Sequence, residues 1–376
     1  MRVSAQASTF CETALSSAVT QVRGFLEQHR NPASIPRSVD GSGNVSYVDA
    51  SDWTSGFVAG TLWYLFEYSG DPAFRSAAEA RTLALEGQKT NTRTHDVGFM
   101  INSSFGNGLR LTNNAAYVDV LVTAAGSLGT RFNETVGATR SWSWGTWSFP
   151  VIVDNLMNLE LLFRASKLDG SATFADMAVT HALTTLRDHF RPDASSYHLI
   201  DYDPSSGQVL SKETRQGLAN ESAWARGQAW GLYGFTMCFR ESSDPRFLEQ
   251  ALNIADFLVD NPDIPADGIP YFDFSAPETD GVPPLRDASA AAIIASALLE
   301  LQGFAPAEAA ARYRARALKV LQTLASAQYS APAGTNGHFI LMHSVGDYPR
   351  SSEVDAAINY ADYYYLEALL RCRALP

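Results

Sequence analysis

The chain has 376 residues, of which 46% are hydrophobic and 18% are charged, so it can bury a sizeable core. Its formal net charge is −12, from 28 basic and 40 acidic residues. This balance argues against a protein that binds the phosphate backbone of nucleic acids, because such proteins present a basic face. No run approaches 18 uninterrupted apolar residues, which argues against a membrane-spanning helix.

The three cysteines, Cys11, Cys238 and Cys372, form no CxxC motif and show no disulfide-like spacing. A sparse, odd set of this kind is typical of a reducing compartment or of inert buried thiols. The first 20 residues also lack the apolar run of a signal peptide. We therefore expect free cysteines and a cytoplasmic location.

A weak repeat recurs along the whole chain, and each copy combines a nearly all-apolar helix, a break and an amphipathic helix. The copies span 52–74, 95–117, 150–174, 224–247, 287–310 and 354–374. The breaks at 70–74, 169–174 and 243–247 contain Gly, Pro and Asp, which end helices and form turns. The repeat therefore predicts six helical hairpins.

The two helices of a hairpin differ in their hydrophobic pattern. Residues 290–301 are apolar on every side, and such a helix must be covered all round. Residues 312–324 instead carry one apolar stripe, with arginines and a lysine facing away from it. Six buried helices, each paired with a half-exposed one, predict an all-α (α/α)₆ barrel that forms a single domain over 1–376. An open α-solenoid is the alternative, but its repeats would be more evenly spaced.

Strand-like alternation is scarce in this sequence. The short runs near 269–274 and 337–343 are expected to be loops or minor hairpins. The inner helices of the predicted barrel are parallel, so the polar residues at their starts share one end of the ring. These residues are Trp53, His95, Asp96, Asp154, Asn155, Asn158, Arg226, Asp287, Asn359 and Asp362. Because helix N-termini favour anions, this end predicts a site for an anionic sugar.

Asp154 is the most informative of these residues, since its neighbours in VIVDNLMNLELLF are almost all apolar. Burying a lone carboxylate costs several kcal/mol unless it is paired, hydrogen-bonded or protonated. Desolvation also raises a carboxyl pKa, as a general acid near neutral pH requires. The alternative is a structural N-cap or a hydrogen bond to a neighbouring Asn; the apolar helix favours a catalytic role.

Asp96 follows His95 and precedes a predicted helix, so two interpretations stay open. It can cap that helix, which alone would explain it. It can also be the second carboxylate of a catalytic pair, in which two nearby carboxyl groups push their pKa values apart. The sequence does not separate the two.

Aromatic and polar residues near the same end complete the predicted site. Tryptophans stack on sugar rings, and the segment 141–147, SWSWGTW, is hard to explain as core. The long polar segment 189–217 is expected to be an irregular functional loop. His198, Gln216 and Arg226 are candidates for holding a carboxylate and hydroxyl groups. The sequence has no HExxH, P-loop, GxGxxG after a strand, or GxSxG, so we expect no metal or nucleotide cofactor.

The chain resembles the unsaturated glucuronyl hydrolases, glycoside hydrolase family 88, over nearly its whole length. The resemblance rests on HDVGF (95–99), RSW (140–142), FPVIVDNLMNLELL (149–162), RPDASSYH (191–198), TRQG (214–217), WARGQAWGLYGF (224–235) and DASAAAIIASALLEL (287–301). It implies the same (α/α)₆ barrel. It also implies that Asp154 is the acid/base and Asp96 the second catalytic aspartate. The implied substrate-binding residues are Trp53, His95, Trp142, His198, Thr214, Gln216, Arg226 and Trp230.

The resemblance implies an unusual hydrolysis without a metal or organic cofactor. The substrate would be a di- or oligosaccharide ending in a 4,5-unsaturated uronate, whose C4=C5 vinyl ether is hydrated. Ala194, Arg215 and Ala361 depart from the family's usual pattern, and Arg215 is expected to affect preference beyond the terminal sugar. An unsaturated rhamnogalacturonyl hydrolase acting on pectin fragments is the nearest alternative. A non-catalytic carbohydrate-binding or structural toroid and an epimerase are further ones. The sequence leaves the oligomeric state open.

Overall fold

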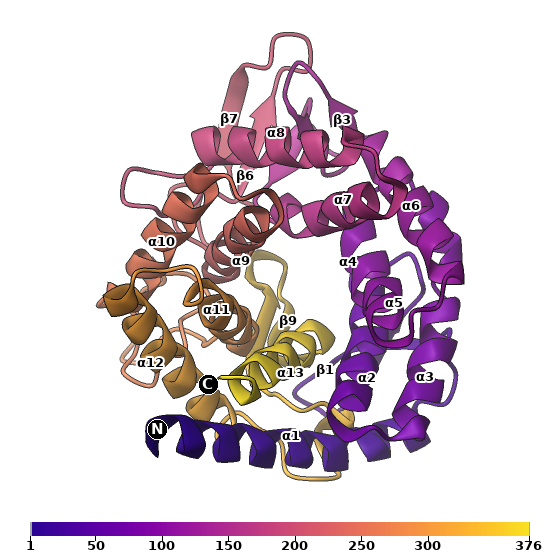
Figure 1. Cartoon of the computed structure of the whole chain (residues 1–376). Coiled ribbons are helices and arrows are strands. Elements are labelled where there is room, and N and C mark those ends of the chain that lie inside the picture. Colours follow the sequence, from indigo (N-terminus) through magenta and orange to yellow (C-terminus); the bar gives the residue numbers. More distant parts are fainter. Residues whose placement is uncertain (1, 376) are drawn as a thin grey trace.

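The computed structural model describes residues 2–375, with side chains described from residue 9 onward. Its helices form two concentric rings, as Figure 1 shows, and the predicted (α/α)₆ barrel is confirmed. The inner ring consists of α2 (Ser55–Ser69), α4 (Val97–Ile101) with the π-turn η2 (Asn102–Gly106) and α5 (Asn107–Thr112), α7 (Asn155–Asp169), α9 (Ala225–Ser242), α11 (Ala288–Leu301) and α13 (Asn359–Arg373). The outer ring consists of α1 (Arg2–Gln28), α3 (Pro72–Leu83), α6 (Ala116–Gly129), α8 (Thr173–Asp188), α10 (Pro245–Asp260) and α12 (Ala307–Leu324).

Local chemistry sets the turn between an inner helix and its outer partner. Gly70, with a φ of 67°, ends α2 in the left-handed region that favours glycine. Asp71 then accepts a hydrogen bond from the Ala73 N–H, and Pro72 opens α3. Asp244 and Pro245 repeat this arrangement at the start of α10. The Gly, Asp and Pro residues of the breaks therefore do the turning that the sequence predicts.

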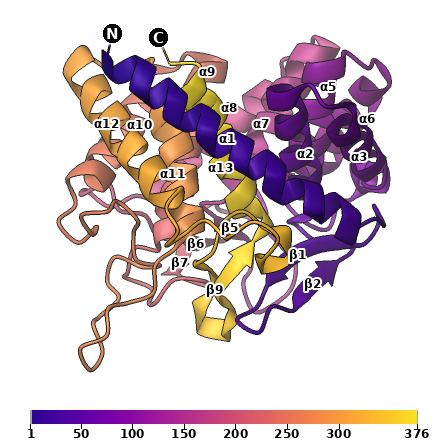
Figure 2. The same cartoon turned by 90° about the horizontal axis from the view of Figure 1, so that it is seen from below.

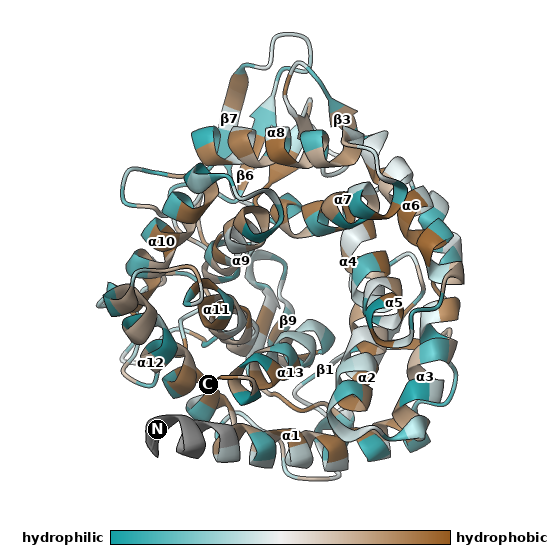
Figure 3. Cartoon of the chain, in the orientation of Figure 1, coloured by the Kyte–Doolittle hydropathy of each residue, from teal (hydrophilic) through white to brown (hydrophobic). Residues whose placement is uncertain are grey.

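The two rings bury different fractions of their surfaces. In α11, every residue from Ala288 to Leu301 is buried except Glu300. In α10, burial follows one stripe, which comprises Phe247, Ala251, Ile254, Ala255 and Leu258. Figure 3 shows this stripe pattern as alternating hydrophobic and hydrophilic patches along the outer helices. The core therefore lies between the rings, as the all-apolar and one-striped patterns predict.

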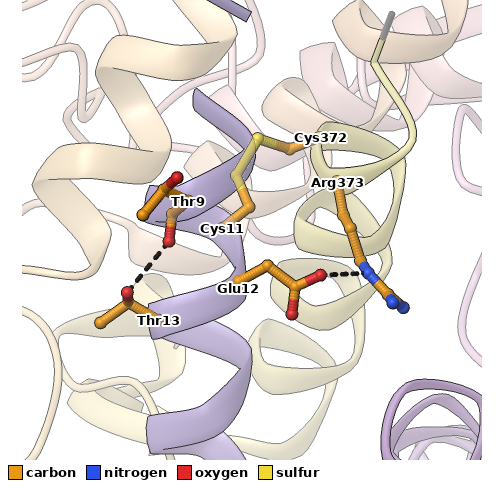
Figure 4. Close-up of a disulfide and its surroundings, with 6 residues drawn as sticks. All are labelled: Thr9, Cys11, Glu12, Thr13, Cys372 and Arg373. Atoms are coloured by element: carbon orange, nitrogen blue, oxygen red, sulfur yellow. Dashed lines mark hydrogen bonds and ion pairs between the residues drawn. A yellow bond between two sulfur atoms is a disulfide. The ribbon is translucent and has the colours of Figure 1, made fainter. Parts of the chain in front are cut away.

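The N-terminal helix completes the outer ring, because α1 packs beside α13 at the end of the chain (Figures 1 and 2). A disulfide joins Cys11 of α1 to Cys372 of α13, and Arg373 forms an ion pair with Glu12 beside it (Figure 4). The expectation of free cysteines is therefore wrong for this pair, and only Cys238 is a free, buried thiol among the described residues. A sequence separation of 361 residues gave no spacing signal, because the two cysteines meet only when the ring closes.

Short strands gather at the end of the ring where the inner helices begin (Figure 2). One antiparallel sheet has the order β2-β1-β9-β8, a second has the order β5-β6-β7, and β3 pairs with β4. Their bounds are β1 (Ile35–Val39), β2 (Val45–Val48), β3 (Phe132–Asn133), β4 (Ala138–Thr139), β5 (Pro150–Ile152), β6 (Leu199–Tyr202), β7 (Val209–Glu213), β8 (Ser344–Asp347) and β9 (Ser352–Ile358). Three short 3₁₀ helices are η1 (Glu86–Thr90), η3 (Asn336–His338) and η4 (Tyr348–Arg350).

The sheets correct part of the sequence-based description. The segment 189–217 is not an irregular loop throughout, because it contains β6 and β7. The runs near 269–274 and 337–343 form isolated bridges and no named strand, as expected for loops. These bridges pair Tyr271 with Arg286, Asp273 with Trp224 and Leu341 with Ser330. No helix in the described part of the chain is long and apolar enough to cross a membrane.

Ion pairs of the inner helices line a cavity of about 440 Å³ at the opposite end of the ring. Arg240 of α9 pairs with Glu160 of α7 and Glu300 of α11, and Arg371 of α13 pairs with Glu300 and Glu367. Each of these guanidinium groups therefore has its carboxylate partners within the protein. The charges of this end are therefore largely paired with one another, although the buried Glu367 Oε2 has no hydrogen-bond partner in the described part of the chain.

Candidate active site

Asp154 lies directly before α7 and is 7% exposed. It occupies the N-cap position, but its side chain accepts no hydrogen bond from the first turn of the helix. Asp287 at the start of α11 behaves differently, since it accepts from the N–H groups of Ser289 and Ala290. A structural capping role is therefore not what holds Asp154 here. Its Oδ2 is buried and has no hydrogen-bond partner among the described residues.

Burial raises the pKa of the Asp154 carboxyl to about 7. The nearby positive charge of Arg226 acts against this rise, and the carboxylate of Asp96 adds to it. A carboxyl group with this pKa holds its proton in about half of the molecules at neutral pH. Asp154 can therefore both give and take a proton at neutral pH.

His198 directs an N–H toward Asp154. Its Nδ1 accepts hydrogen bonds from the backbone N–H groups of Arg215, at 3.1 Å, and Gln216, at 3.3 Å. The proton of the neutral ring must then be on Nε2, which lies 3.6 Å from Asp154 Oδ2. Burial lowers the His198 pKa well below its ordinary value, so the ring is neutral at pH 7. Trp224 packs on the ring, with 4.6 Å between the ring centroids.

Asp96 precedes α4, and its side chain likewise does not cap the helix. Its Oδ2 accepts a hydrogen bond from the Thr94 hydroxyl at 2.9 Å, and its Oδ1 lies 3.1 Å from His95 Nε2. His95 Nδ1 donates to the Ser141 carbonyl at 2.9 Å. Burial raises the pKa of Asp96, which the partial charge of His95 opposes. Of the two open interpretations of Asp96, the capping one does not match this geometry.

Arg226, in the first turn of α9, is 1% exposed and paired with Asp287 at 3.2 Å. Its two terminal nitrogens donate to the backbone carbonyls of Val345 and Gly346 on β8. Gln216 Nε2 donates to the same Gly346 carbonyl at 3.2 Å. This anchor could not be predicted from the sequence, because it consists of backbone carbonyls far along the chain.

The aromatic residues divide into a buried group and a partly exposed group. Trp230 of α9 is fully buried against Phe99, and Trp53 packs on Phe99 and Tyr360. Trp142 is 7% exposed and stacks on the half-exposed Trp144, with 4.8 Å between ring centroids and 11° between planes.

Other residues that the sequence placed at this end have structural roles. Asp362 accepts the N–H groups of Ile340 and Leu341 at 2.8 Å each, which anchors the loop before β8. Asn158 accepts the Phe99 N–H, and Asn155 bonds to Thr139 and Ser141. Thr214 Oγ1 accepts the Gly217 N–H at 2.9 Å and so shapes the loop that holds His198.

Two aromatic residues outside the predicted binding set, Trp224 and Tyr360, lie against Arg226. The Arg226 guanidinium lies 4.5 Å from the Trp224 ring centroid and 5.3 Å from that of Tyr360. The sequence signal for Trp224 was present, since it opens WARGQAW, but a tryptophan before a helix is usually core.

Several of the buried polar atoms that lack a hydrogen-bond partner among the described residues belong to this site. Besides Asp154 Oδ2, they include His198 Nε2, Arg226 Nε and the indole nitrogens of Trp142, Trp224 and Trp230. An unpaired buried polar group costs about 1–3 kcal/mol, so proteins keep such groups where a ligand completes them. Donors dominate this set, and they suit the oxygens of a carboxylated sugar.

Known proteins are similar to this chain over most of its length. An unsaturated glucuronyl hydrolase of Formosa agariphila is 46% identical over 340 residues, which cover 89% of this chain and 84% of that protein. An unsaturated chondroitin disaccharide hydrolase of Streptococcus pyogenes is 31% identical over 365 residues, covering 95% and 90%. No family model matches the chain.

Solved structures extend the likeness to the fold. An unsaturated glucuronyl hydrolase specific for heparin superposes with a TM-score of 0.93 at 48% identity, covering 96% of both chains. The enzyme from Streptococcus agalactiae superposes with a TM-score of 0.89 at 28% identity, covering 97% of this chain and 92% of that one. The barrel, the buried aspartate and relatives of this identity over most of the chain lead to one conclusion: the chain belongs to the unsaturated glucuronyl hydrolases of glycoside hydrolase family 88 and is a glycosidase.

Proposed function

We propose that this chain releases the terminal 4,5-unsaturated uronate from lyase-generated oligosaccharides, with Asp154 as the acid and base. The observation that carries the proposal is the Asp154 carboxyl, which is buried, has a pKa near 7 and keeps Oδ2 free of hydrogen bonds. An acid that acts at neutral pH needs this combination of a held proton and an open position toward its substrate.

The reaction begins at the C4=C5 double bond, which is a vinyl ether because C5 carries the ring oxygen. Protonated Asp154 gives its proton to C4, and positive charge develops on C5 and the ring oxygen. Water adds to C5 and returns a proton to the Asp154 carboxylate. This addition makes C5 a hemiketal carbon. The bond between C5 and the ring oxygen then breaks, and the hemiacetal exposed at C1 releases the remaining saccharide. Protons and electrons balance, so one residue serves as acid and then as base.

The other predicted residues have roles that follow from their positions. Asp96 raises the Asp154 pKa by its charge and stabilises the positive charge on C5. His198 Nε2–H orients the Asp154 carboxyl or donates to the substrate. The unpartnered donors Trp142 Nε1 and Arg226 Nε hold the uronate carboxylate and hydroxyls. Trp230 lies against the Asp154 carboxyl and lowers its pKa, and it lines the binding site together with His95, Trp53, Thr214 and Gln216. We infer that the whole ring acts as one catalytic domain.

The names of the relatives support a glycosaminoglycan-derived substrate, since they refer to heparin and chondroitin. The parent polysaccharide and the cytoplasmic location both stay predictions. The disulfide between Cys11 and Cys372 weighs against that location, because disulfides persist mainly in oxidising compartments. Fractionation of cells, with thiol alkylation before lysis, would place the protein and report its disulfide together.

The proposal is tested with unsaturated disaccharides made by lyases from chondroitin, hyaluronan and heparin, and with pectin- and gellan-derived products. Turnover destroys the conjugated double bond, so its ultraviolet absorbance falls. Asp154→Asn should abolish this fall while retaining the fold by circular dichroism. Asp176→Asn, an exposed aspartate on α8, is the matched control and should keep the wild-type rate. A near-normal rate for Asp154→Asn would refute the acid role.

Selective turnover of the pectin-derived product would instead favour the rhamnogalacturonyl alternative. The absence of turnover on every substrate would favour a non-catalytic toroid. The 46% identity to an unsaturated glucuronyl hydrolase favours the proposed function over both of these alternatives.

A further inference from the structure

Arg215 forms one wall of the site together with two tryptophans. Its guanidinium lies 4.4 Å from the ring centroid of Trp144 and 5.8 Å from that of Trp142. Since Trp142 and Trp144 are stacked face to face, the three side chains form a continuous layer. Such stacking holds a guanidinium in one orientation and leaves its N–H edge open to a ligand.

This guanidinium has no carboxylate within ion-pair distance among the described residues. The nearest acidic group that affects it is Asp347, and Asp347 is already paired with Arg350 at 2.9 Å. Arg350 itself donates to the Arg215 carbonyl at 2.9 Å, so two positive side chains adjoin here. Partial burial and, to a smaller extent, the repulsion by Arg350 lower the Arg215 pKa, although the group stays charged at neutral pH. Two cationic side chains, Arg215 and Arg350, therefore lie together in a chain whose net charge is −12.

The layer is connected to the catalytic residues and leads outward from them. The backbone N–H of Arg215 bonds to His198, which faces Asp154. Trp142, next to His95, is 7% exposed, whereas Trp144 is 51% exposed and Arg215 is partly exposed. With a terminal sugar bound at Asp154, the following sugar would lie along this layer toward solvent.

We propose that Arg215 binds a sulfate group on the sugar that follows the terminal unsaturated uronate. The inference rests on the proposed function. Trp144 would stack on the face of that second sugar, and the guanidinium edge would donate two parallel hydrogen bonds to sulfate oxygens. Arg350 adjoins Arg215, but its charge is already paired with Asp347, so the anion is assigned to Arg215. The site would thus select sulfated over unsulfated products of the lyase.

The test compares two unsaturated disaccharides that differ only in a sulfate on the second sugar. For each, kcat/KM is measured with the wild type, Arg215→Gln, Arg215→Lys and Arg75→Gln. Arg75 is an exposed arginine on the outer helix α3, so its variant controls for the loss of one charge. We expect the ratio of sulfated to unsulfated kcat/KM to fall about tenfold or more in Arg215→Gln, through KM. Arg215→Lys should restore part of the ratio, because it keeps the charge but not the fork.

An unchanged ratio in Arg215→Gln would overturn the proposal, including the case in which both substrates slow equally because the loop at His198 has moved. An equal fall in Arg75→Gln would also overturn it, since a long-range charge effect would then explain the preference. Calorimetric titration of both disaccharides into Asp154→Asn, with and without Arg215→Gln, separates this proposal from the reaction itself. If the wild type turns over neither disaccharide, the proposed function fails. If Asp154→Asn binds the two disaccharides with equal affinity in the titration, the sulfate site is overturned.

Discussion

His95 Nε2 lies 3.1 Å from Asp96 Oδ1, and the surroundings require a proton between them. The Ser141 carbonyl can only accept a hydrogen bond, so His95 Nδ1 carries a hydrogen. A neutral His95 would then turn the lone pair of Nε2 toward a carboxylate oxygen, which is repulsive. A shared proton held mainly on Nε2 removes this conflict and leaves the negative charge on Asp96. Burial lowers the His95 pKa and raises that of Asp96, but the charge of each group opposes the shift of the other.

The first prediction concerns the pH dependence of the wild type. Asp154 must be protonated to start the reaction, and its pKa is about 7. We expect kcat/KM to be constant below this pH and to fall tenfold per pH unit well above it. A pH–rate profile with a lyase-generated disaccharide measures this limb. A rate that still rises between pH 7 and 9 would contradict the assignment of Asp154 as the acid.

The second prediction concerns Asp96→Asn. The Asn amide can donate to His95 Nε2 in place of the shared proton, so the local geometry should persist. Loss of the negative charge lowers the Asp154 pKa, because Asp96 raises it in the wild type. The alkaline limb of the pH–rate profile should therefore move to lower pH, with a rate about 10²-fold below wild type. An unmoved limb with a reduced rate would leave Asp96 with a role in binding alone.

The third prediction concerns the stability cost of Asp154. Its folded pKa of about 7 lies above the ordinary value of about 3.9, so the unfolded chain ionises first as the pH rises. Stability is therefore lost between about pH 4 and pH 7, at up to about 1.4 kcal/mol per pH unit. Asp154→Asn removes this loss and should raise the unfolding temperature at pH 8. The gain should shrink toward pH 5, and a gain that does not depend on pH would contradict the explanation.

The fourth prediction concerns the buried pair between Arg226 and Asp287. Asp287→Ala leaves the Arg226 charge buried with only carbonyl partners and also removes the N-cap of α11. We expect a loss of about 3–5 kcal/mol. Asp71→Ala removes a similar cap from the exposed start of α3 and should cost only about 1 kcal/mol. Denaturant unfolding of both variants measures the difference, and equal losses would mean that capping alone explains Asp287.

The fifth prediction concerns the disulfide between Cys11 and Cys372. Replacing both cysteines with serine should lower the stability by about 2–4 kcal/mol, since the bond restricts the unfolded chain. A reductant should lower the unfolding temperature of the wild type to about the value of the double variant. The double variant itself should not respond to the reductant. If the reductant leaves the unfolding temperature of the wild type unchanged, the bond does not form in solution.

Much of the fold could be predicted from hydrophobic pattern alone. Helices that are apolar on every side, such as α11, must lie inside, and helices with one stripe, such as α10, must cover them. The strands were missed because they are short, at two to seven residues, and because β6 is buried throughout and shows no alternation. The partner of Cys11 was missed because contact across 361 residues depends on ring closure.

From physical reasoning alone, a site residue could be predicted only where a polar side chain lies in an apolar stretch of sequence. Asp154 stood out because a carboxylate in an apolar helix has a cost that the local sequence does not offset. The proton position on His198 depends on two backbone N–H groups from another loop, which no side-chain pattern reveals. The backbone carbonyls that accept hydrogen bonds from Arg226 also cannot be predicted from the sequence.

The position of α1 beside α13 has a consequence for the connectivity of the fold. Because Cys11 and Cys372 have Cα atoms 6.3 Å apart, the first and last helices adjoin as any two consecutive helices of the barrel do. The order of the chain around the ring is then almost circular, and the place where it is cut is incidental to the catalytic end. A circular permutant with a short linker between the start of α1 and the end of α13, and new ends in the exposed loop at 278–282, should assemble the same ring.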